Sequence, residues 1–352
     1  MKHSIGILGA GAWGTALALS LARSGHDVEL WAIEPDVVES INIHHENTRY
    51  LPGHTTPKNL VASLDKRKVA SDKNFIIIAS PSIYLESTVS DICDIPSLKS
   101  GTTAIGVLTK GFIPSDSGPR LVLETLESFL PPVYNKSLVY IAGPSHAEEV
   151  AIGKLTGLIA ASENPMNSIR FRELLRSRSL LVFSSLDVIG VQVCAAAKNV
   201  IAVAFGVLDA IAENSNSFGD NTESLLLAAG LNEIQTIGRA MGATHQETFT
   251  SIAGVGDLDV TCRSKYGRNR RFGQDIIKKD ILAKFSSLDD LLSRITEIGY
   301  LPEGAVACKY VHELSLLQNL KLPICNGLFT ILNKENDPVQ FIEQLLDGDR
   351  TL

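Results

Sequence analysis

A glycine-rich segment near the N-terminus has the residue types and spacing that bind a diphosphate. Gly9, Gly11 and Gly14 form a Gly-x-Gly-x-x-Gly pattern that follows a strand-like run and opens a helical pattern. In this context the first glycine allows a tight turn, the second lets the backbone approach a pyrophosphate, and the third lets the helix pack on the strand. The segment predicts a dinucleotide site with the phosphates at the helix N-terminus. The alternative is a glycine-rich turn without a ligand.

An acidic residue, Glu34, follows the second expected strand, about 20 residues beyond the last glycine of this pattern. A carboxylate there hydrogen-bonds the adenosine ribose hydroxyls and repels a 2′-phosphate, which favours NAD over NADP. The alternative is that Glu34-Pro35-Asp36 only begins a helix, whose dipole favours acidic residues in the first turn. Both interpretations stay open on the sequence.

A lysine, Lys198, is the only charged residue in the apolar stretch from Val188 to Leu208. Burial lowers a lysine pKa, and a second cation nearby, for which Lys110 is the candidate, lowers it further. A lysine tuned in this way can take a proton from an alcohol while hydride leaves the same carbon. The alternatives are a structural pair with a carboxylate and a lysine that extends its amine to the helix surface.

Polar residues that no periodicity requires gather in four segments. The segments are Thr109-Lys110-Gly111, Gly143-Pro144-Ser145-His146-Ala147, Ala197-Lys198-Asn199, and the run that contains Gly256-Asp257-Leu258, Thr261 and Gly267-Arg268-Asn269-Arg270. The first two follow expected strands at their carboxyl ends, where open α/β sheets bind ligands. In the last, a guanidinium and an amide stand where a loop becomes a helix, an arrangement that suits a phosphate monoester. A solvated helix start is the alternative there.

Short β-rich runs alternate with helical patterns in the first half of the chain. The expected strands are Ser4–Leu8, Asp27–Trp31, Phe75–Ala79, Thr103–Val107, Leu138–Ala142, Gly157–Ala161 and Leu180–Phe183. The helical patterns between them are Trp13–Ser24, Pro35–His44, Tyr84–Ile92, Arg120–Leu130 and Ser168–Ser177. This alternation predicts a parallel, doubly wound sheet of the Rossmann type, covered by helices on both faces.

The strand signal ends near Asp187, and the rest of the chain predicts helices only. They are Val188–Asp209, Glu223–Met241, Asn269–Lys279, Gly304–Leu320 and Val339–Leu346. A chain of 352 residues usually forms more than one domain. We therefore expect a dinucleotide-binding Rossmann domain over 1–187 and an all-helical substrate-binding domain over 188–352, joined directly by the long apolar helix.

Composition excludes several classes of function. The net charge is −7, from 32 Lys and Arg against 39 Asp and Glu, without a long basic run, so no nucleic-acid footprint is expected. The five cysteines are never spaced as Cys-x-x-Cys, which argues against a zinc site or a disulfide framework and favours the cytoplasm. The N-terminus lacks a signal-peptide pattern. The apolar stretch around Lys198 predicts a buried core helix, because a central lysine disfavours a membrane span.

Motifs along nearly the whole chain resemble NAD(P)-dependent glycerol-3-phosphate dehydrogenase. In family order they are Gly9–Ala18 (GAGAWGTALA), Asn47–Gly53 (NTRYLPG), Thr109–Gly111 (TKG), Gly143–Ala147 (GPSHA), Val188–Val203 (VIGVQVCAAAKNVIAV), Ala253–Leu258 (AGVGDL) and Gly267–Gly273 (GRNRRFG). The resemblance implies interconversion of sn-glycerol 3-phosphate and dihydroxyacetone phosphate, a supply of glycerol 3-phosphate for phospholipid synthesis, and a homodimer.

The resemblance also implies a role for individual residues. Lys198 would be the proton acceptor, with Asp257 and Asn199 beside it and Lys110 and Thr261 orienting the substrate. The positions implied for the substrate are Lys110, Gly143, Ser145, Lys198, Asp257, Arg268 and Asn269, the last two at its phosphate. The positions implied for the cofactor are Gly9, Gly11, Ala12, Trp13, Gly14, Lys110, Ala147, Arg268 and Glu303.

Three positions depart from the family pattern. Ile33-Glu34 stands where many bacterial members have a basic residue that tolerates NADP, so we expect a preference for NAD. Gly267 replaces a serine, which leaves phosphate binding to Arg268, Asn269 and backbone groups. Glu223 replaces an arginine, which calls into question any role of that arginine in a dimer or in domain closure.

Two other functions use part of the same pattern. A two-domain dehydrogenase of the hydroxyacid type has a lysine helix but acts on a carboxylate, and the Arg268-Asn269 pair argues for phosphate instead. A non-catalytic nucleotide-binding redox sensor needs the glycines but has no need of Lys198, Lys110 and Asp257 together.

Overall fold

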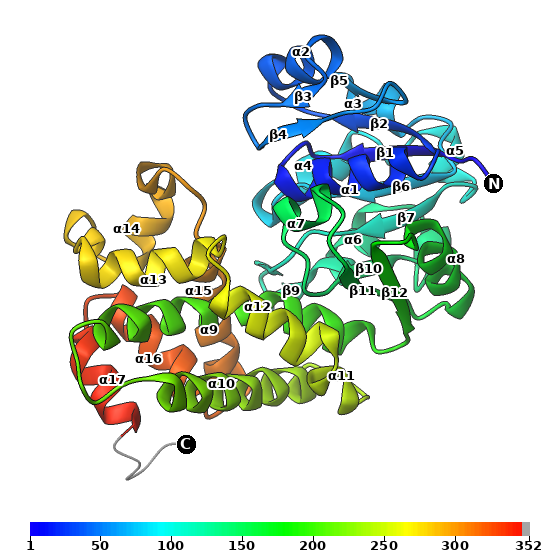
Figure 1. Cartoon of the computed structure of the whole chain (residues 1–352). Coiled ribbons are helices and arrows are strands. Elements are labelled where there is room, and N and C mark those ends of the chain that lie inside the picture. The colour runs from blue at the N-terminus through cyan, green and yellow to red at the C-terminus, as the bar shows by residue number, and fades with distance from the viewer. Residues whose placement is uncertain (347–352) are drawn as a thin grey trace. The chain divides into compact units, whose positions relative to one another are not determined.

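The computed structural model of this chain describes residues 1–346. The described chain divides into two compact units. The first contains Met1–Ile113 and Leu121–Val188, and the second contains Pro114–Arg120 and the chain from Ile189 onward. Figure 1 colours the first unit mainly blue to green and the second mainly green to red.

An eight-stranded sheet forms the centre of the first unit, in the order β12-β11-β10-β7-β6-β1-β2-β5. Its strands are β1 (Ser4–Leu8), β2 (Asp27–Trp31), β5 (Leu60–Ser63), β6 (Phe75–Ile78), β7 (Ala104–Val107), β10 (Val139–Ala142), β11 (Thr156–Ala161) and β12 (Leu180–Ser185). Seven of these strands were predicted, with shifts of at most two residues at their ends. Strand β5 was missed because it is a four-residue edge strand with a partly exposed face.

The expectation of a wholly parallel sheet was wrong at one place, because β10 and β11 are antiparallel. A parallel connection needs a crossover of a dozen or more residues, usually through a substantial helix. The only helix between these strands is the five-residue α7 (Ala147–Ala151), which packs on α1 (Ala12–Arg23) instead of crossing the sheet. The chain therefore enters β11 from the opposite direction.

Helices accompany the sheet of the first unit (Figure 1). Besides α1 and α7 they are α2 (Pro35–Ile43), α3 (Lys66–Ala70), α4 (Leu85–Ser90), α5 (Pro96–Lys99), α6 (Val122–Phe129) and α8 (Pro165–Leu175). Two small ladders pair β3 (Glu46–Asn47) with β4 (Leu51–Thr55) and β8 (Phe112–Ile113) with β9 (Arg120–Leu121). Single turns of 3₁₀-helix cover Ser82–Tyr84 and Pro132–Tyr134.

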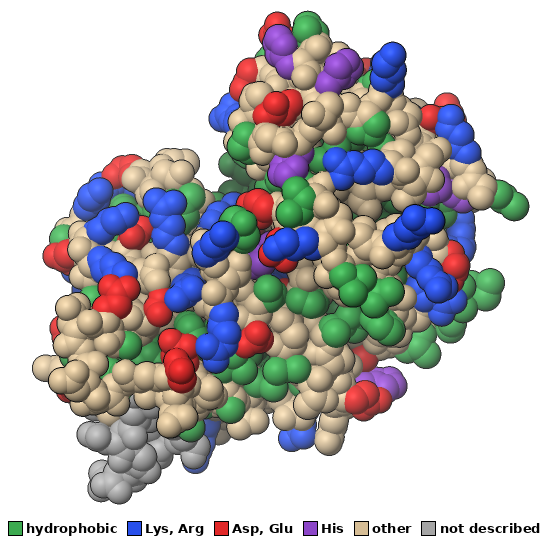
Figure 2. Space-filling view, in the orientation of Figure 1, with side chains coloured by type: hydrophobic (Ala, Val, Ile, Leu, Met, Phe, Trp, Pro, Cys, Tyr) green, Lys and Arg blue, Asp and Glu red, His purple; other side chains and the backbone are tan. Residues whose placement is uncertain are grey.

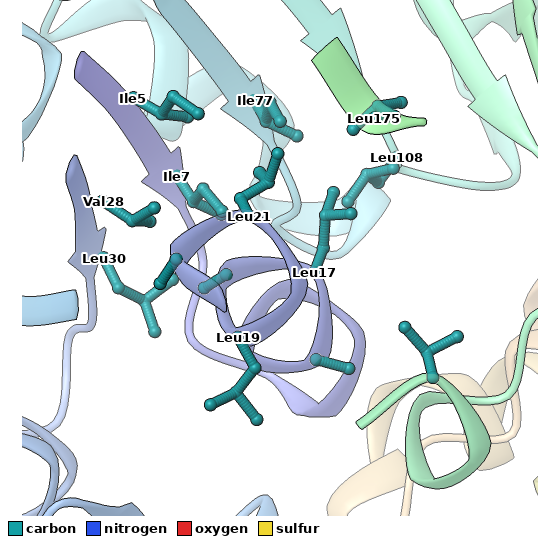
Figure 3. Packing of buried hydrophobic residues seen from close by; sticks show 14 of the residues in the cluster. Ile5, Ile7, Leu17, Leu19, Leu21, Val28, Leu30, Ile77, Leu108 and Leu175 are labelled. Carbon is teal, nitrogen blue, oxygen red and sulfur yellow. The ribbon is translucent and has the colours of Figure 1, made fainter. Parts of the chain in front are cut away.

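Apolar packing between β1, β2 and α1 fixes where the first strand turns into the first helix. Leu21 of α1 lies near Ile7 of β1 in Figure 3, and both are at most 2% exposed. Burying one such side chain contributes about 1.5–3 kcal/mol. The turn that carries the glycines is therefore held at both of its ends.

The second unit is helical, and the described residues after Asp187 contain no strand. Its helices are α9 (Val188–Ala212), α10 (Asp220–Ala240), α11 (Glu247–Thr250), α12 (Asp257–Arg263), α13 (Arg268–Lys278), α14 (Leu288–Ser293), α15 (Glu303–Leu317), α16 (Pro323–Leu332) and α17 (Pro338–Leu346). A π-helix covers Ile252–Gly256, and 3₁₀ turns cover Ile281–Lys284 and Ile295–Ile298. All five predicted helices are present. Helices α11, α12, α14 and α16 were missed, since each has at most ten residues.

Helix α9 is long and apolar enough to cross a membrane, by length and composition alone. However, 94% of its most apolar window is buried inside the protein. It is a core helix, as predicted.

On the visible face of the molecule, Lys and Arg side chains lie among Asp and Glu side chains instead of forming one basic patch (Figure 2).

Candidate active site

In the glycine-rich turn, the backbone requires glycine at Gly9 and at Gly14. Gly9 has a φ of +129°, and a Cβ there would lie 2.8 Å from the carbonyl of Ala79. A Cβ on Gly14 would lie 2.1 Å from the carbonyl oxygen of Gly9, so only glycine lets α1 approach β1 this closely. At Gly11 a Cβ would meet nothing within 4 Å, which leaves open space beside the N-terminus of α1.

The N-terminus of α1 has features that suit an anion. Gly11 is its N-cap residue, no side chain caps the helix, and its first turn contains no acidic residue. Backbone N–H groups at such a terminus carry partial positive charge. Ala12 and Trp13 belong to this first turn and pack against the apolar core.

Glu34 is the N-cap residue of α2, but its side chain does not cap that helix. Its Oε1 accepts a hydrogen bond of 2.6 Å from the hydroxyl of Tyr50 instead. The pKa of Tyr50 is raised, first by burial and then by this hydrogen bond. The backbone of Glu34 therefore begins the helix, whereas the carboxylate is held by another element.

The other predicted residues of the first unit follow strands at their carboxyl ends. Lys110 comes three residues after β7 ends, and Gly143 directly follows β10. Gly143 has a φ of +141°, and a Cβ there would lie 2.6 Å from the carbonyl oxygen of Gly157. Ser145 donates a hydrogen bond of 3.1 Å to the carbonyl of Gly143, and Ala147 begins α7.

In the second unit, Lys198 lies in a buried polar cluster. It is 5% exposed, and its ammonium group forms an ion pair with the carboxylate of Asp257, which is 1% exposed. Lys198 also donates a hydrogen bond of 2.8 Å to the hydroxyl of Thr261. That hydroxyl donates in turn to the backbone carbonyl of Asp257 at 2.6 Å, so its oxygen is oriented to accept from the lysine.

The backbone before Asp257 explains the Ala253–Leu258 motif. The π-helix Ile252–Gly256 runs directly into α12, whose first residue is Asp257. A Cβ on Gly254 would lie 2.0 Å from the carbonyl oxygen of Phe249, so the tight backbone there requires glycine. Irregular helical turns of this kind often occur at functional sites. Here the π-helix places Asp257 beside Lys198.

Three helices meet beside this cluster. On α9, Asn199 donates a hydrogen bond of 3.4 Å to Glu303, the first residue of α15. Glu303 also lies 3.7 Å from the guanidinium of Arg268, the first residue of α13. Asn269 accepts a hydrogen bond of 2.8 Å from the N–H of Gly304. The predicted residues Asn199, Arg268, Asn269 and Glu303 are therefore brought together.

Glycines allow these helices to approach one another. A Cβ on Gly206 of α9 would lie 2.0 Å from the carbonyl oxygen of Arg270, and one on Gly273 of α13 would lie 2.1 Å from that of Val203. A Cβ on Gly304 would lie 2.4 Å from the carbonyl oxygen of Asn199. The backbones of α13 and α15 therefore lie against α9 at the points where the polar side chains meet.

Two opposing effects act on the charge state of Lys198 in the helical cluster. Burial disfavours its charged form, whereas the adjacent carboxylate of Asp257 favours it. Nearby Cys262 is fully buried, and burial raises the pKa of its thiol to about 12. Cys262 therefore stays protonated near neutral pH and is no candidate nucleophile. Among the described residues, no group of three or more His, Cys, Asp or Glu could hold a metal ion.

Comparisons with known proteins give two matches that together cover most of the chain. Residues 4–168 match the N-terminal part of NAD-dependent glycerol-3-phosphate dehydrogenase, and residues 187–343 match its C-terminal part. This chain belongs to the NAD-dependent glycerol-3-phosphate dehydrogenase family. The matched regions contain every residue that the sequence predicted for the site.

Individual relatives agree with this membership. The chain is 63% identical to the glycerol-3-phosphate dehydrogenase [NAD(P)+] of Treponema denticola, over 99% of both chains. It is 57% identical to that of Treponema pallidum, over 97% of this chain and 99% of the relative. The crystal structure of glycerol-3-phosphate dehydrogenase from Coxiella burnetii matches with a TM-score of 0.84 and 33% identity, over 99% of both chains.

Two features of the site were not given a role by the sequence. The carboxylate of Glu223, which replaces a family arginine, forms an ion pair of 2.8 Å with the guanidinium of Arg263, the last residue of α12. Asn47 is fully buried and contacts the glycine-rich turn. Asn47 and Tyr50 belong to the Asn47–Gly53 motif, so the signal was present, but periodicity does not show what a buried amide contacts.

Proposed function

We propose that this chain interconverts sn-glycerol 3-phosphate and dihydroxyacetone phosphate with NAD(P)+ as cosubstrate. The observation that carries this proposal is the buried Lys198–Asp257–Thr261 cluster, in a chain 63% identical to an enzyme named for that activity. A buried lysine held by a carboxylate and a hydroxyl is equipped to move a proton.

The first unit would hold the nicotinamide dinucleotide. The open space at Gly11 and the uncapped N-terminus of α1 fit a pyrophosphate, because backbone N–H groups and helix dipole both favour an anion there. Ala12, Trp13, Lys110 and Ala147 are the further residues proposed to contact it. When bound, the nicotinamide accepts or returns a hydride at C2 of the substrate.

Lys198 would exchange the proton of the C2 hydroxyl. In alcohol oxidation its amine takes the proton, and Asp257 stabilises the ammonium group that forms. In ketone reduction the same ammonium group returns the proton. Thr261 keeps the Nζ atom in place, since its own proton is engaged by the carbonyl of Asp257. Lys110 is proposed to orient the substrate, and Gly143 and Ser145 are proposed to contact it.

The substrate phosphate would lie at the N-terminus of α13. Gly267 is the N-cap residue and no side chain caps this eleven-residue helix, so its N–H groups can serve an anion. The side chain of Arg268 is 58% exposed and is held only loosely by Glu303, which leaves the guanidinium able to turn to a phosphate. Asn269 would contribute its side-chain amide, whose oxygen already accepts a hydrogen bond from the N–H of Gly304.

The finer properties are part of the same proposal. NAD would be preferred over NADP, because Glu34 meets the adenosine ribose beside the neutral and exposed Ile33. We further propose a Rossmann domain over 1–187, a substrate domain over 188–352, a cytoplasmic homodimer, and a role in supplying glycerol 3-phosphate for phospholipid synthesis. Size-exclusion chromatography with light scattering tests the dimer.

One absorbance assay tests the activity. The loss of NADH is followed with dihydroxyacetone phosphate, with unphosphorylated dihydroxyacetone, and with a 3-oxo acid. Fast turnover of the phosphate ester alone is expected, because Arg268 and Asn269 are proposed to bind the phosphate. Faster turnover of the 3-oxo acid would contradict the proposed substrate and would favour a hydroxyacid dehydrogenase activity.

A further inference from the structure

The turn that begins at Asn47 is tied to the glycine-rich turn by a buried side chain. Asn47 is 0% exposed, and its amide donates a hydrogen bond of 2.9 Å to the carbonyl of Ala10. It donates a second, of 2.8 Å, to the hydroxyl of Thr15 in the first turns of α1. A buried amide with both donors engaged holds its partners in fixed positions.

These bonds set the orientation of one peptide plane. The carbonyl of Ala10 accepts from Asn47 and also from the hydroxyl of Thr15, at 3.1 Å. In a trans peptide the carbonyl and the next N–H point in opposite directions. Holding the Ala10 oxygen toward Asn47 therefore turns the N–H of Gly11 away from Asn47. A pyrophosphate meets the protein at this glycine.

The same turn also contacts Glu34, the residue proposed to bind the adenosine ribose. The side-chain oxygen of Asn47 accepts a hydrogen bond of 3.1 Å from the N–H of Tyr50, which closes the turn. The Tyr50 hydroxyl then donates to the carboxylate of Glu34 at 2.6 Å. Arg49 lies over the Tyr50 ring at 5.4 Å and pairs with Asp36 at 3.3 Å, which adds a second contact to α2.

We propose that the Asn47–Tyr50 turn is a positioning device for the adenosine diphosphate half of the cofactor. Asn47 fixes the backbone that meets the pyrophosphate, and Tyr50 fixes the carboxylate that meets the ribose. This inference rests on the proposed function, because it assumes a dinucleotide on the glycine-rich turn. One short segment would thus set the distance between two recognition points that lie in different loops.

The first experiment measures binding of ADP-ribose and NADH to the full chain by titration calorimetry. Asn47→Ser is compared with Asn59→Ser, because the Asn59 amide also donates to two backbone carbonyls of this unit, those of Ala22 and His26, both at 2.7 Å. Both variants are expected to melt at a lower temperature. Only Asn47→Ser should bind ADP-ribose about tenfold more weakly, a loss of about 1.4 kcal/mol.

The controls separate this inference from the proposed function. Equal affinity for ADP-ribose in Asn47→Ser and wild type, or an equal loss in Asn59→Ser, would overturn the role of Asn47. Failure of the wild type to bind ADP-ribose or NADH would instead contradict the dinucleotide site itself. Should Asn47→Ser not fold, the Tyr50 variant tests the same turn.

The second experiment removes one hydroxyl. Tyr50→Phe is compared with Tyr134→Phe, whose buried hydroxyl donates to the carbonyl of Thr103 at 2.8 Å. Tyr50→Phe should weaken NADH binding about threefold to tenfold and NADPH binding less, and in a Glu34→Ala background it should have no further effect. The same loss in both backgrounds, or the same loss from Tyr134→Phe, would overturn the role of Tyr50.

Discussion

The hydroxyl of Thr261 donates a hydrogen bond of 2.6 Å to the backbone carbonyl of Asp257, one turn earlier in α12. This bond uses the only proton of the hydroxyl, so its oxygen can only accept from a third group. Lys198 is that group, at 2.8 Å. The threonine is therefore an acceptor that favours the charged lysine.

Replacing Thr261 with valine should move the pH dependence of turnover. The variant keeps the side-chain shape but removes the acceptor, which destabilises the ammonium group and lowers the pKa of Lys198. Reduction of dihydroxyacetone phosphate needs the protonated lysine, so the alkaline limb of the kcat profile should shift to lower pH. Thr261→Ser keeps the acceptor and serves as the control. An unchanged alkaline limb in Thr261→Val would contradict the assignment.

Arg268→Leu should raise the KM for dihydroxyacetone phosphate steeply, because it removes the charge-assisted contact to the phosphate. Weak activity on unphosphorylated dihydroxyacetone should change much less. Arg271→Leu is the matched control, since this exposed arginine lies on the same helix and pairs with Asp275 at 3.8 Å. Equal losses on both substrates would show that Arg268 is structural or serves the cofactor alone.

The double variant Ile33→Arg with Glu34→Ser should move the preference toward NADPH. It supplies a cation and removes the repulsion of a 2′-phosphate that carries about −1.5 to −2 charges. The ratio of kcat/KM values for the two cofactors should change by a factor of about ten or more, about 1.4 kcal/mol. Both cofactors are measured at one ionic strength. If the wild type already prefers NADPH, Glu34 does not recognise the ribose and only begins α2.

Local patterns made the dinucleotide half of the fold predictable. The alternation of apolar runs located β1 and β2 to the residue, and the local backbone requires glycine at Gly9 and Gly14. The direction of β11 was not predictable in this way, because strand periodicity is the same in both directions. It depends on how α7 packs on α1, which is a tertiary contact.

The helical half shows a different limit. Lys198 stood out as a charge in an apolar helix, but its partner Asp257 lies 59 residues away and follows a π-helix that no periodicity marks. Only the family resemblance joined the two residues in advance. The buried role of Asn47 was missed for the same reason, since its partners Ala10 and Thr15 lie 37 and 32 residues away.

The central claim is that Lys198 moves the substrate proton, and Lys198→Met tests it most directly. Methionine keeps much of the side-chain volume in α9 but has no titrating amine. In single-turnover reduction of dihydroxyacetone phosphate at saturating NADH, the rate of NADH oxidation should fall by about 10²–10⁴-fold. NADH binding, followed by calorimetry, should stay at the wild-type value. A rate close to that of the wild type would contradict the account.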